Sequence, residues 1–562
     1  MDVFSSSYEF HERIESPLAF VRREWQAILV FGGGFTVVMM FAILVVDPSY
    51  FYPRLSTDPL LYYLKGLSFA EFGHTSATLT VNRPAFRYVA MPGVLRSPFM
   101  MIFDDFDSQL RAIQISNVAI VAVVAVMHGY IVSWVLPVAR HWIAIGFAFG
   151  FMLLSPVWAA NVFSPLAEAP YSAFTLATLI LIVRLVCSER GLRSQIPTIV
   201  LAVAFFALAF LVKFTAPALM VFAAVLVIGR ARKHGTSARK LITGGAAAAS
   251  VLLLLLVLNW EVLSKRYFPD FLHFYLNADK VAMLFHLVGA ALPSQVIPDF
   301  HLAFSQPPAL YPYQPALIFT TADLVLAAVG VLISATMFFG LWKARDRFFP
   351  ETAYFLCALP FLALIIPSTS RYLMAYQPII WVYFYVGAAA LVRPITSRVR
   401  WNAWLPVGGL LVAAAFAGGL VLLRSTRLAG TEAKRATSIS IGETRAYVGQ
   451  VSSTFRDLRG FLDSLDRSRT LLIGTRGNFG RWKAISGLSY FRPDSALPRA
   501  TVERDVYLLL ECGTFDTCQQ FSAWQRLTQD SLGKFGKFEY QSVFARSTEH
   551  AKAQVYRIRI QP

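Results

Sequence analysis

The sequence predicts a polytopic α-helical membrane protein with about 11 transmembrane helices, followed by a small extracytoplasmic α/β domain. Hydrophobic residues make up 56% of the 562-residue chain and charged residues only 15%. Apolar stretches recur that are long enough to cross a ~30 Å hydrocarbon core. After residue 423 the composition changes, and charged residues become frequent. A water-soluble domain carries more charge and interrupts its apolar runs sooner.

Each predicted span is an apolar stretch of about 17–25 residues or slightly less. The predicted spans are 26–46, 115–137, 142–160, 166–186, 196–212, 214–229, 241–260, 321–342, 352–367, 372–392 and 403–423. Residues 1–25 form a cytoplasmic N-terminal segment, and 26–423 form the transmembrane domain. The two stretches beside Lys213 leave two readings open: two spans, or one broken helix that changes every later orientation.

Basic residues fall on alternate connections between the spans. The connections assigned to the inside hold 18 Lys and Arg residues, whereas the short outer connections hold only Lys213 and Arg371. Because Lys and Arg favour the cytoplasmic side, the N-terminus is expected inside and the C-terminus outside. The net charge of +18 is partly this bias, so it does not indicate a nucleic-acid partner.

Two outer loops, 47–114 and 261–320, are longer than simple connections require. In the first loop we expect two short helices at the membrane surface, at 58–72 and 104–114. Loops of this length without function are uncommon, so both are expected to contribute to a site.

Residues 424–562 are predicted to form the outer α/β domain. The runs RTLLIGTRG, RDVYLLLEC and AQVYRIRI are expected to be strands, and 447–465 and 518–532 helices. An excess of 22 Lys and Arg over 13 Asp and Glu suits anionic membrane lipids. In GTRGNFGRW, Arg476 or Arg481 is a candidate phosphate contact; a plain turn into a helix is the alternative.

Two cysteines of this domain, Cys512 and Cys518, are candidates for a disulfide, which an oxidising compartment allows. A metal-binding pair is the alternative, although no nearby His or Cys completes a zinc set.

Four ionisable residues lie where spans end on the outer side: Asp58, Glu168, Lys213 and Arg371. Ionisable groups in such places are costly and often functional. Each also has a structural explanation, since Asp58 precedes a proline and is typical of a helix start. Glu168 suits a helix N-terminus, Lys213 can reach the interface along its own stem, and Arg371 can cap a turn.

The sequence around these residues resembles the GT-C fold glycosyltransferases that depend on polyprenyl phosphate. The resemblance covers most of 26–392 and is carried by DPLLY in the first outer loop, SPLAEAPY, LVKFTAP and SRYLMAYQP. The similar families are the protein mannosyltransferases, the aminoarabinose transferases and the arabinofuranosyltransferases.

The resemblance implies roles for individual residues. Asp58 matches the family's first-loop catalytic carboxylate, which deprotonates the acceptor hydroxyl or helps to hold a metal. Glu168 matches the acidic residue that begins the fourth span, a supporting or acceptor-side group of the catalytic site. Lys213 and Arg371, with the adjacent Tyr372, match groups that bind the donor phosphate. Where many relatives carry paired acids, this chain has Asp58 followed by Pro59, which departs from a metal-binding pattern.

A divalent cation (Mg, Mn or Ca) is a further expectation, because oxygen ligands suit these ions. Its candidate ligands are Asp104, Asp105 and Asp107; the alternative for this acidic run is a solvated helix start.

These observations together predict an inverting glycosyltransferase at the outer face of a bacterial inner membrane. Its donor is expected to be a polyprenyl-phosphate sugar, and its acceptor a glycan, lipid or protein hydroxyl of the cell envelope. Two other functions stay open: a secondary transporter or flippase of lipid-linked glycans, and a non-catalytic envelope-assembly subunit. A transporter would place its charges near the bilayer midplane, in broken helices.

Overall fold

The computed structural model describes, apart from a few single positions, residues 14–54, 57–72, 91–187, 192–213, 287–298, 321–345, 347–364, 370–396, 441–474, 481–486, 489–491, 505–512, 538–548 and 551–560. Its contacts divide the chain into two compact units. The first comprises Met1–Val38, Val118–Asn161 and Ala167–Thr437, and the second comprises Met39–Asn117, Val162–Leu166 and Ser438–Pro562. The predicted domain boundary at residue 424 stays a prediction.

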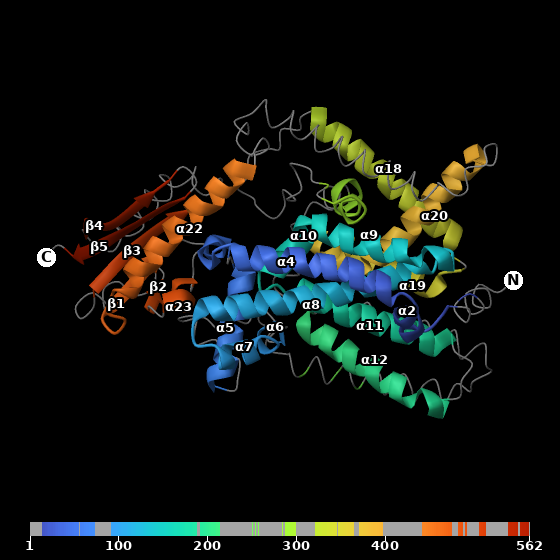
Figure 1. The fold of residues 1–562 in the computed structure, drawn as a ribbon, viewed down its shortest axis with the longest axis horizontal. Coiled ribbons are helices and arrows are strands. Elements are labelled where there is room, and N and C mark those ends of the chain that lie inside the picture. The colour runs from blue at the N-terminus through green and yellow to red at the C-terminus, as the bar shows by residue number, and fades with distance from the viewer. Residues whose placement is uncertain are drawn as a thin grey trace. The chain divides into compact units, whose positions relative to one another are not determined.

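The first unit is a helical bundle (Figure 1). Its helices are α2 (Pro17–Arg23), α3 (Trp25–Ala27), η1 (Ile28–Gly32), η4 (Val138–Arg140), α9 (His141–Leu154), α10 (Pro156–Phe163), α11 (Glu168–Cys187), α12 (Leu192–Val212), η6 (Leu287–Ala291), η7 (Pro293–Gln295), α18 (Thr321–Ala344), α19 (Phe349–Leu364), η9 (Ser370–Tyr376) and α20 (Gln377–Thr396). The helices α4 (Gly33–Val45) and α8 (Phe106–Ser133), and the last two residues of α10, extend into the second unit.

Six helices in the described part of the chain are long and apolar enough to cross a membrane, which identifies a multi-pass membrane protein. They are Trp25–Val45, Phe106–Ser133, Glu168–Leu185, Gln195–Val212, Ala327–Ala344 and Leu373–Val392. A seventh is possible if α9 and α10, bent by 73°, form one span. All of these match predicted spans. The predicted spans 214–229 and 403–423, and almost all of 241–260, lie outside the described residues.

The prediction of a separate helix at 104–114 was wrong. Residues 106–133 form the single helix α8, because neither proline nor glycine interrupts the chain before Gly129. Two polar residues inside α8 form hydrogen bonds with backbone carbonyls. Gln114 donates to the carbonyl of Phe163, and Asn117 donates to the carbonyls of Val162 and Ser164. These amides therefore satisfy carbonyls at the C-terminal end of α10 and of Ser164 just after it, which have no partner further along the helix.

The second unit contains the first outer loop and the C-terminal residues. Its elements, besides the parts of α4 and α8, are η2 (Pro48–Arg54), α5 (Thr57–Phe72), α6 (Met91–Val94), α7 (Ser97–Ile102), α22 (Ile441–Asp463), β1 (Thr470–Gly474), α23 (Arg481–Ser486), β2 (Ser489–Phe491), β3 (Asp505–Cys512), β4 (Phe538–Ser547) and β5 (Lys552–Ile560). The helices expected at 58–72 and 447–465 are thus present, the second with an earlier start.

The five described strands form one mixed sheet in the order β2-β1-β3-β5-β4 (Figure 1). β1 pairs in parallel with β2 and β3, whereas β5 is antiparallel to β3 and β4. The three predicted strands correspond to β1, β3 and β5. β2, which has only three residues, and β4 were not predicted. In β4 the alternation of apolar and polar residues is broken by a register shift between Ser542 and Phe544.

One face of α22 forms the core of this unit. Val451, Phe455, Leu458 and Leu462 recur at helical spacing and are buried. They pack with residues of the sheet, of the first outer loop and of α23, among them Phe51, Tyr52, Leu472, Leu509, Trp482 and Val555. The helix α22 and the first outer loop therefore share one apolar core.

Candidate active site

Glu168 and Lys213, which are 45 positions apart, form a buried ion pair in the first unit. Lys213 Nζ lies 3.1 Å from Glu168 Oε1. Lys213 is only 9% exposed, and Glu168 only 4%. A buried pair of this kind neutralises two charges whose separate burial would be very unfavourable.

The helices explain why the two charges meet. Glu168 is the first residue of α11, and Lys213 directly follows α12, with its amide still bonded to the carbonyl of Ala209. α11 and α12 pack against each other, so an anion at a helix N-terminus meets a cation at a helix C-terminus. Both placements are favourable to the helix dipoles. Both residues were predicted site residues, but their pairing was not predicted.

Aromatic side chains accompany this pair. The Tyr171 ring, one turn into α11, lies 5.7 Å from Lys213 Nζ, within the range of a cation–π contact. Tyr354 of α19 and Tyr376 of η9 stack with their ring centroids 4.9 Å apart. Lys213 and these three tyrosines are all buried, so the region contains one cation and three phenol groups.

Asn161 connects the first turn of α11 with η9. Its Oδ1 accepts a hydrogen bond from the Ala169 amide at 3.1 Å, and its Nδ2 lies 3.7 Å from Met374 Sδ. η9 also packs directly against α11. Since η9 contains Arg371 and Tyr372, the structure places the backbone of both candidates on an element that adjoins the helix of Glu168. The side chains of Arg371 and Tyr372 are outside the described part.

Asp58 belongs to the second unit, where it is the second residue of α5. The helix begins at Thr57, so Pro59 falls in the first turn, where a missing amide hydrogen removes no helical bond. The expected helix start is therefore present, one residue earlier than predicted. The Asp58 side chain is not among those described.

Lys65 lies two turns beyond Asp58 on α5, and seven residues bring both positions to the same face of the helix. Lys65 is buried, and its stem faces Gly93 of α6 closely enough that a Cβ at residue 93 would clash with it. Burial lowers the pKa of Lys65 to about 8. Lys65 was not among the predicted site residues, although its seven-residue spacing from Asp58 can be read from DPLLYYLK.

The acidic run 104–107 has structural partners. Asp105 Oδ1 accepts a hydrogen bond from the Ser108 amide at 2.9 Å, which makes Asp105 the cap of α8. Asp107 accepts from Tyr52 at 2.6 Å and pairs with Arg459 at 2.6 Å. Asp104 is exposed.

Among the described residues, no three His, Cys, Asp or Glu side chains converge to hold a metal ion. These residues do not fit a cation site, and a metal requirement stays a prediction.

The remaining candidates lie around β1 and β3. Trp482, in the segment GTRGNFGRW, is buried and donates from Nε1 to Glu511 at 2.9 Å. It follows Arg481, the first residue of the six-residue helix α23. Residues 475–480 lie outside the described residues, so the phosphate contact and the turn into a helix both stay predictions. Arg476 and Cys518 lie outside the described residues, and Cys512 ends β3. The disulfide stays a prediction.

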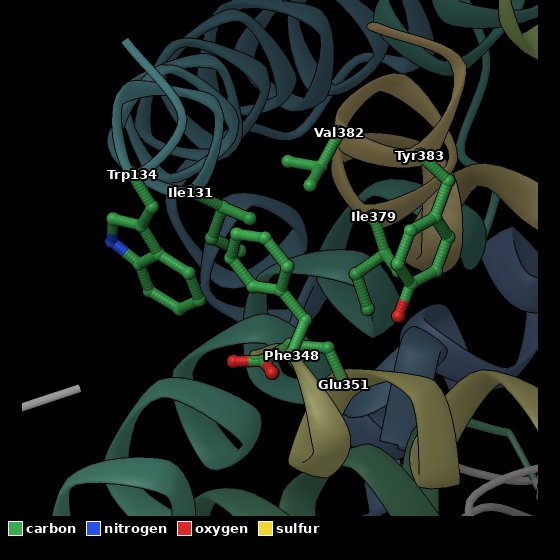
Figure 2. Close-up of a pocket in the computed structure, with 7 residues that line it drawn as sticks. All are labelled: Ile131, Trp134, Phe348, Glu351, Ile379, Val382 and Tyr383. Carbon is green, nitrogen blue, oxygen red and sulfur yellow. The ribbon is translucent and has the colours of Figure 1, made fainter. Parts of the chain in front are cut away.

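A small cavity in the first unit lies apart from these candidates (Figure 2). Its lining residues lie at the C-terminal end of α8 or just after it, at the start of α19 or just before it, and in α20. They are Ile131, Trp134, Phe348, Glu351, Ile379, Val382 and Tyr383. The wall is mostly apolar, and the Tyr383 hydroxyl is bonded to Thr352 at 2.7 Å. None of the predicted site residues lines it.

No family model and no curated protein matches the sequence. Among solved structures, the chain is similar to ArnT from Cupriavidus metallidurans, with a TM-score of 0.47 and 14% identity over 94% of this chain and 97% of that one. It is also similar to the oligosaccharyltransferase AglB from Archaeoglobus fulgidus, with a TM-score of 0.49 and 12% identity over 95% of this chain and 74% of that one. At these scores and identities, the similarity assigns no residue role and no substrate.

Proposed function

We propose that this protein is an inverting membrane glycosyltransferase at the outer face of a bacterial inner membrane. It transfers a sugar from a polyprenyl-phosphate donor to a hydroxyl of a cell-envelope glycan, lipid or protein. The observation that carries the proposal is the buried pair of Glu168 and Lys213, beside which η9 brings the backbone of Arg371. Ionisable groups at the ends of membrane helices are costly to keep, and a function explains them.

The donor phosphate explains the two cations. A phosphate that becomes the leaving group gains charge, which cationic hydrogen-bond donors stabilise. Lys213 donates a hydrogen bond to Glu168 Oε1, so the carboxylate orients an ammonium group whose charge suits a phosphate oxygen. Arg371 supplies the planar, bidentate donors that suit phosphate oxygens, and Tyr372 supplies a neighbouring hydroxyl.

The carboxylate of Asp58 is the proposed general base. It removes the proton from the acceptor hydroxyl, whose oxygen attacks the anomeric carbon. The bond between that carbon and the phosphate oxygen breaks, and the polyprenyl phosphate leaves with the bonding electrons. One in-line displacement of this kind inverts the anomeric configuration. Glu168, which was predicted on the acceptor side, has the additional role of holding Lys213.

The experiment is a comparison of Asp58→Asn with the wild-type protein. In a strain that lacks the native gene, the envelope sugar that depends on this protein is followed by mass spectrometry. Loss of a general base lowers transfer by ~10²–10⁴-fold, while the asparagine variant should still reach the membrane in normal amount. Wild-type transfer by Asp58→Asn would leave Asp58 with only its role at the start of α5.

A further inference from the structure

The helix α22 binds both ends of the first outer loop. Arg456 pairs with Asp47, which lies two residues after α4, where the loop begins. Arg459, one turn further along α22, pairs with Asp107 at 2.6 Å, in the first turn of α8, where the loop ends. Two arginines at a spacing of three residues project from the same side of a helix, so one helix face reaches both ends.

The beginning of the loop is held by further contacts. Ser49 Oγ donates to the carbonyl of Ser452 on α22 at 2.8 Å, and the Ser49 amide donates to Asp47 Oδ1 at 2.9 Å. Although partial burial opposes it, hydrogen bonds from Ser49 and the charge of Arg456 lower the pKa of Asp47. Asp47 is therefore an anion at neutral pH, as its ion pair with Arg456 requires.

Tyr52 joins the two ends of the loop to each other. Its hydroxyl donates to Asp107 Oδ1 at 2.6 Å and accepts from Arg459 at 2.5 Å. Its ring is buried, edge-on to Phe106 and Trp482. Tyr52 precedes Asp58 by six residues, so the chain that leads into α5 begins at a fixed point.

We propose that α22 positions the first outer loop, and that Arg456 and Arg459 fix α5 and with it Asp58 by holding both loop ends. Neither arginine touches the reacting atoms in this proposal; each acts through Asp47, Tyr52 or Asp107. The inference rests on the proposed function only in taking Asp58 as the base. Its structural part, the ordering of α5 by α22, is testable without any substrate.

The first test is hydrogen exchange of the backbone amides of α5 in the full-length protein with Arg456→Gln and Arg459→Gln combined. The matched control is Asp457→Asn, which lies between the two arginines on α22 but pairs with Arg546 of β4 at 3.1 Å. Exchange in α5 should rise by about tenfold or more in the double variant, because local opening becomes easier, and stay unchanged in the control. Wild-type exchange in the double variant would overturn the proposal.

The second test separates positioning from general loss of structure. The double variant should lower kcat by roughly tenfold to a hundredfold with an unchanged KM for the donor, since the phosphate-binding residues are intact. The charge exchange Asp47→Arg with Arg456→Asp should recover much of the kcat that Arg456→Asp alone loses. An equal loss with every variant on α22, including Asp457→Asn, would overturn the positioning role.

The two proposals fail in different ways. If Asp58→Asn transfers sugar normally, the proposed function loses its base, whereas faster exchange in α5 would still support the ordering of the loop by α22. If Asp58→Asn is inactive and the double arginine variant keeps wild-type kcat, the proposed function stands and the positioning inference is overturned.

Discussion

At the scale of single residues, the pairing of Glu168 with Lys213 decides how either residue is to be tested. Removal of one partner leaves the other buried charge without its ion-pair partner, and this is far more destabilising than removal of both. A loss of activity after substitution of Lys213 alone would therefore mix stability with donor binding.

We predict that Lys213→Met lowers the free energy of unfolding by about 3 kcal/mol or more, and that adding Glu168→Gln recovers most of this loss. Thermal unfolding in detergent measures both. The double variant should then bind polyprenyl phosphate more weakly than wild type. Equal stability of the single and double variants would argue against the ion pair.

Lys65 gives a prediction on pH dependence. The folded protein releases the Lys65 proton near pH 8, whereas the unfolded chain holds it up to the ordinary lysine pKa of 10.5. The unfolded state therefore binds more protons in this window, and stability contributed by this group rises as the pH increases from 8 to 10.5. Relative to Lys65→Met, the wild-type protein should gain thermal stability over this range. A constant difference between the two proteins would contradict the lowered pKa.

At the scale of elements, α18 and α20 approach each other through glycines. A Cβ at Gly340 would clash with the backbone carbonyl of Tyr383, and one at Gly387 with that of Thr336. Backbone atoms of a packed helix cannot rotate away as a side chain does. Small residues at such crossings are a common basis for helix association in membranes.

We predict that Gly340→Ala and Gly387→Ala each destabilise the bundle by about 1–3 kcal/mol, because the helices must separate. Gly150→Ala in α9 is the control, since a Cβ there meets nothing within 4 Å. Thermal unfolding of the three variants should show a loss only for the two α18 and α20 substitutions. A neutral Gly340→Ala would show that the helices do not cross so closely.

Single elements also show where sequence reasoning succeeds and where it fails. The apolar face of α22 and the long apolar spans were predictable, because helical spacing and length are local properties. The extent of α8 was not, since Gln114 and Asn117 bond to carbonyls 45–49 residues away, at the C-terminal end of α10. Likewise, the bulge in β4 disrupts the alternation by which a strand is recognised.

At the scale of the whole molecule, the candidates were predictable but their partners were not. Charge at the end of an apolar span singled out Glu168 and Lys213, yet their contact depends on which spans are neighbours. The ion pairs of α22 with Asp47 and Asp107 join residues that are more than 350 positions apart in the sequence. No local pattern marks such pairs, because only the folded chain brings them together.

Orientation is the prediction that belongs to this scale. The distribution of Lys and Arg places the connection after α18 inside and the residues after 423 outside. In intact cells, a single cysteine at Ser464 should react with an impermeant thiol reagent, and one at Arg345 should react only after the membrane is opened. Both positions are exposed in the structure. Labelling of Arg345→Cys from outside would reverse the orientation.

The lipid that remains bound to the purified protein tests the central claim most directly. Mass spectrometry of lipids extracted from wild-type protein should identify a polyprenyl phosphate or its sugar-linked form. The amount should fall sharply in a variant that combines Arg371→Lys, Lys213→Met and Glu168→Gln, because charge-assisted bonds to the phosphate are lost while no buried charge is left unpaired. Absence of polyprenyl phosphate from the wild-type protein, or equal retention by the variant, would contradict a polyprenyl-phosphate donor bound by Lys213 and Arg371.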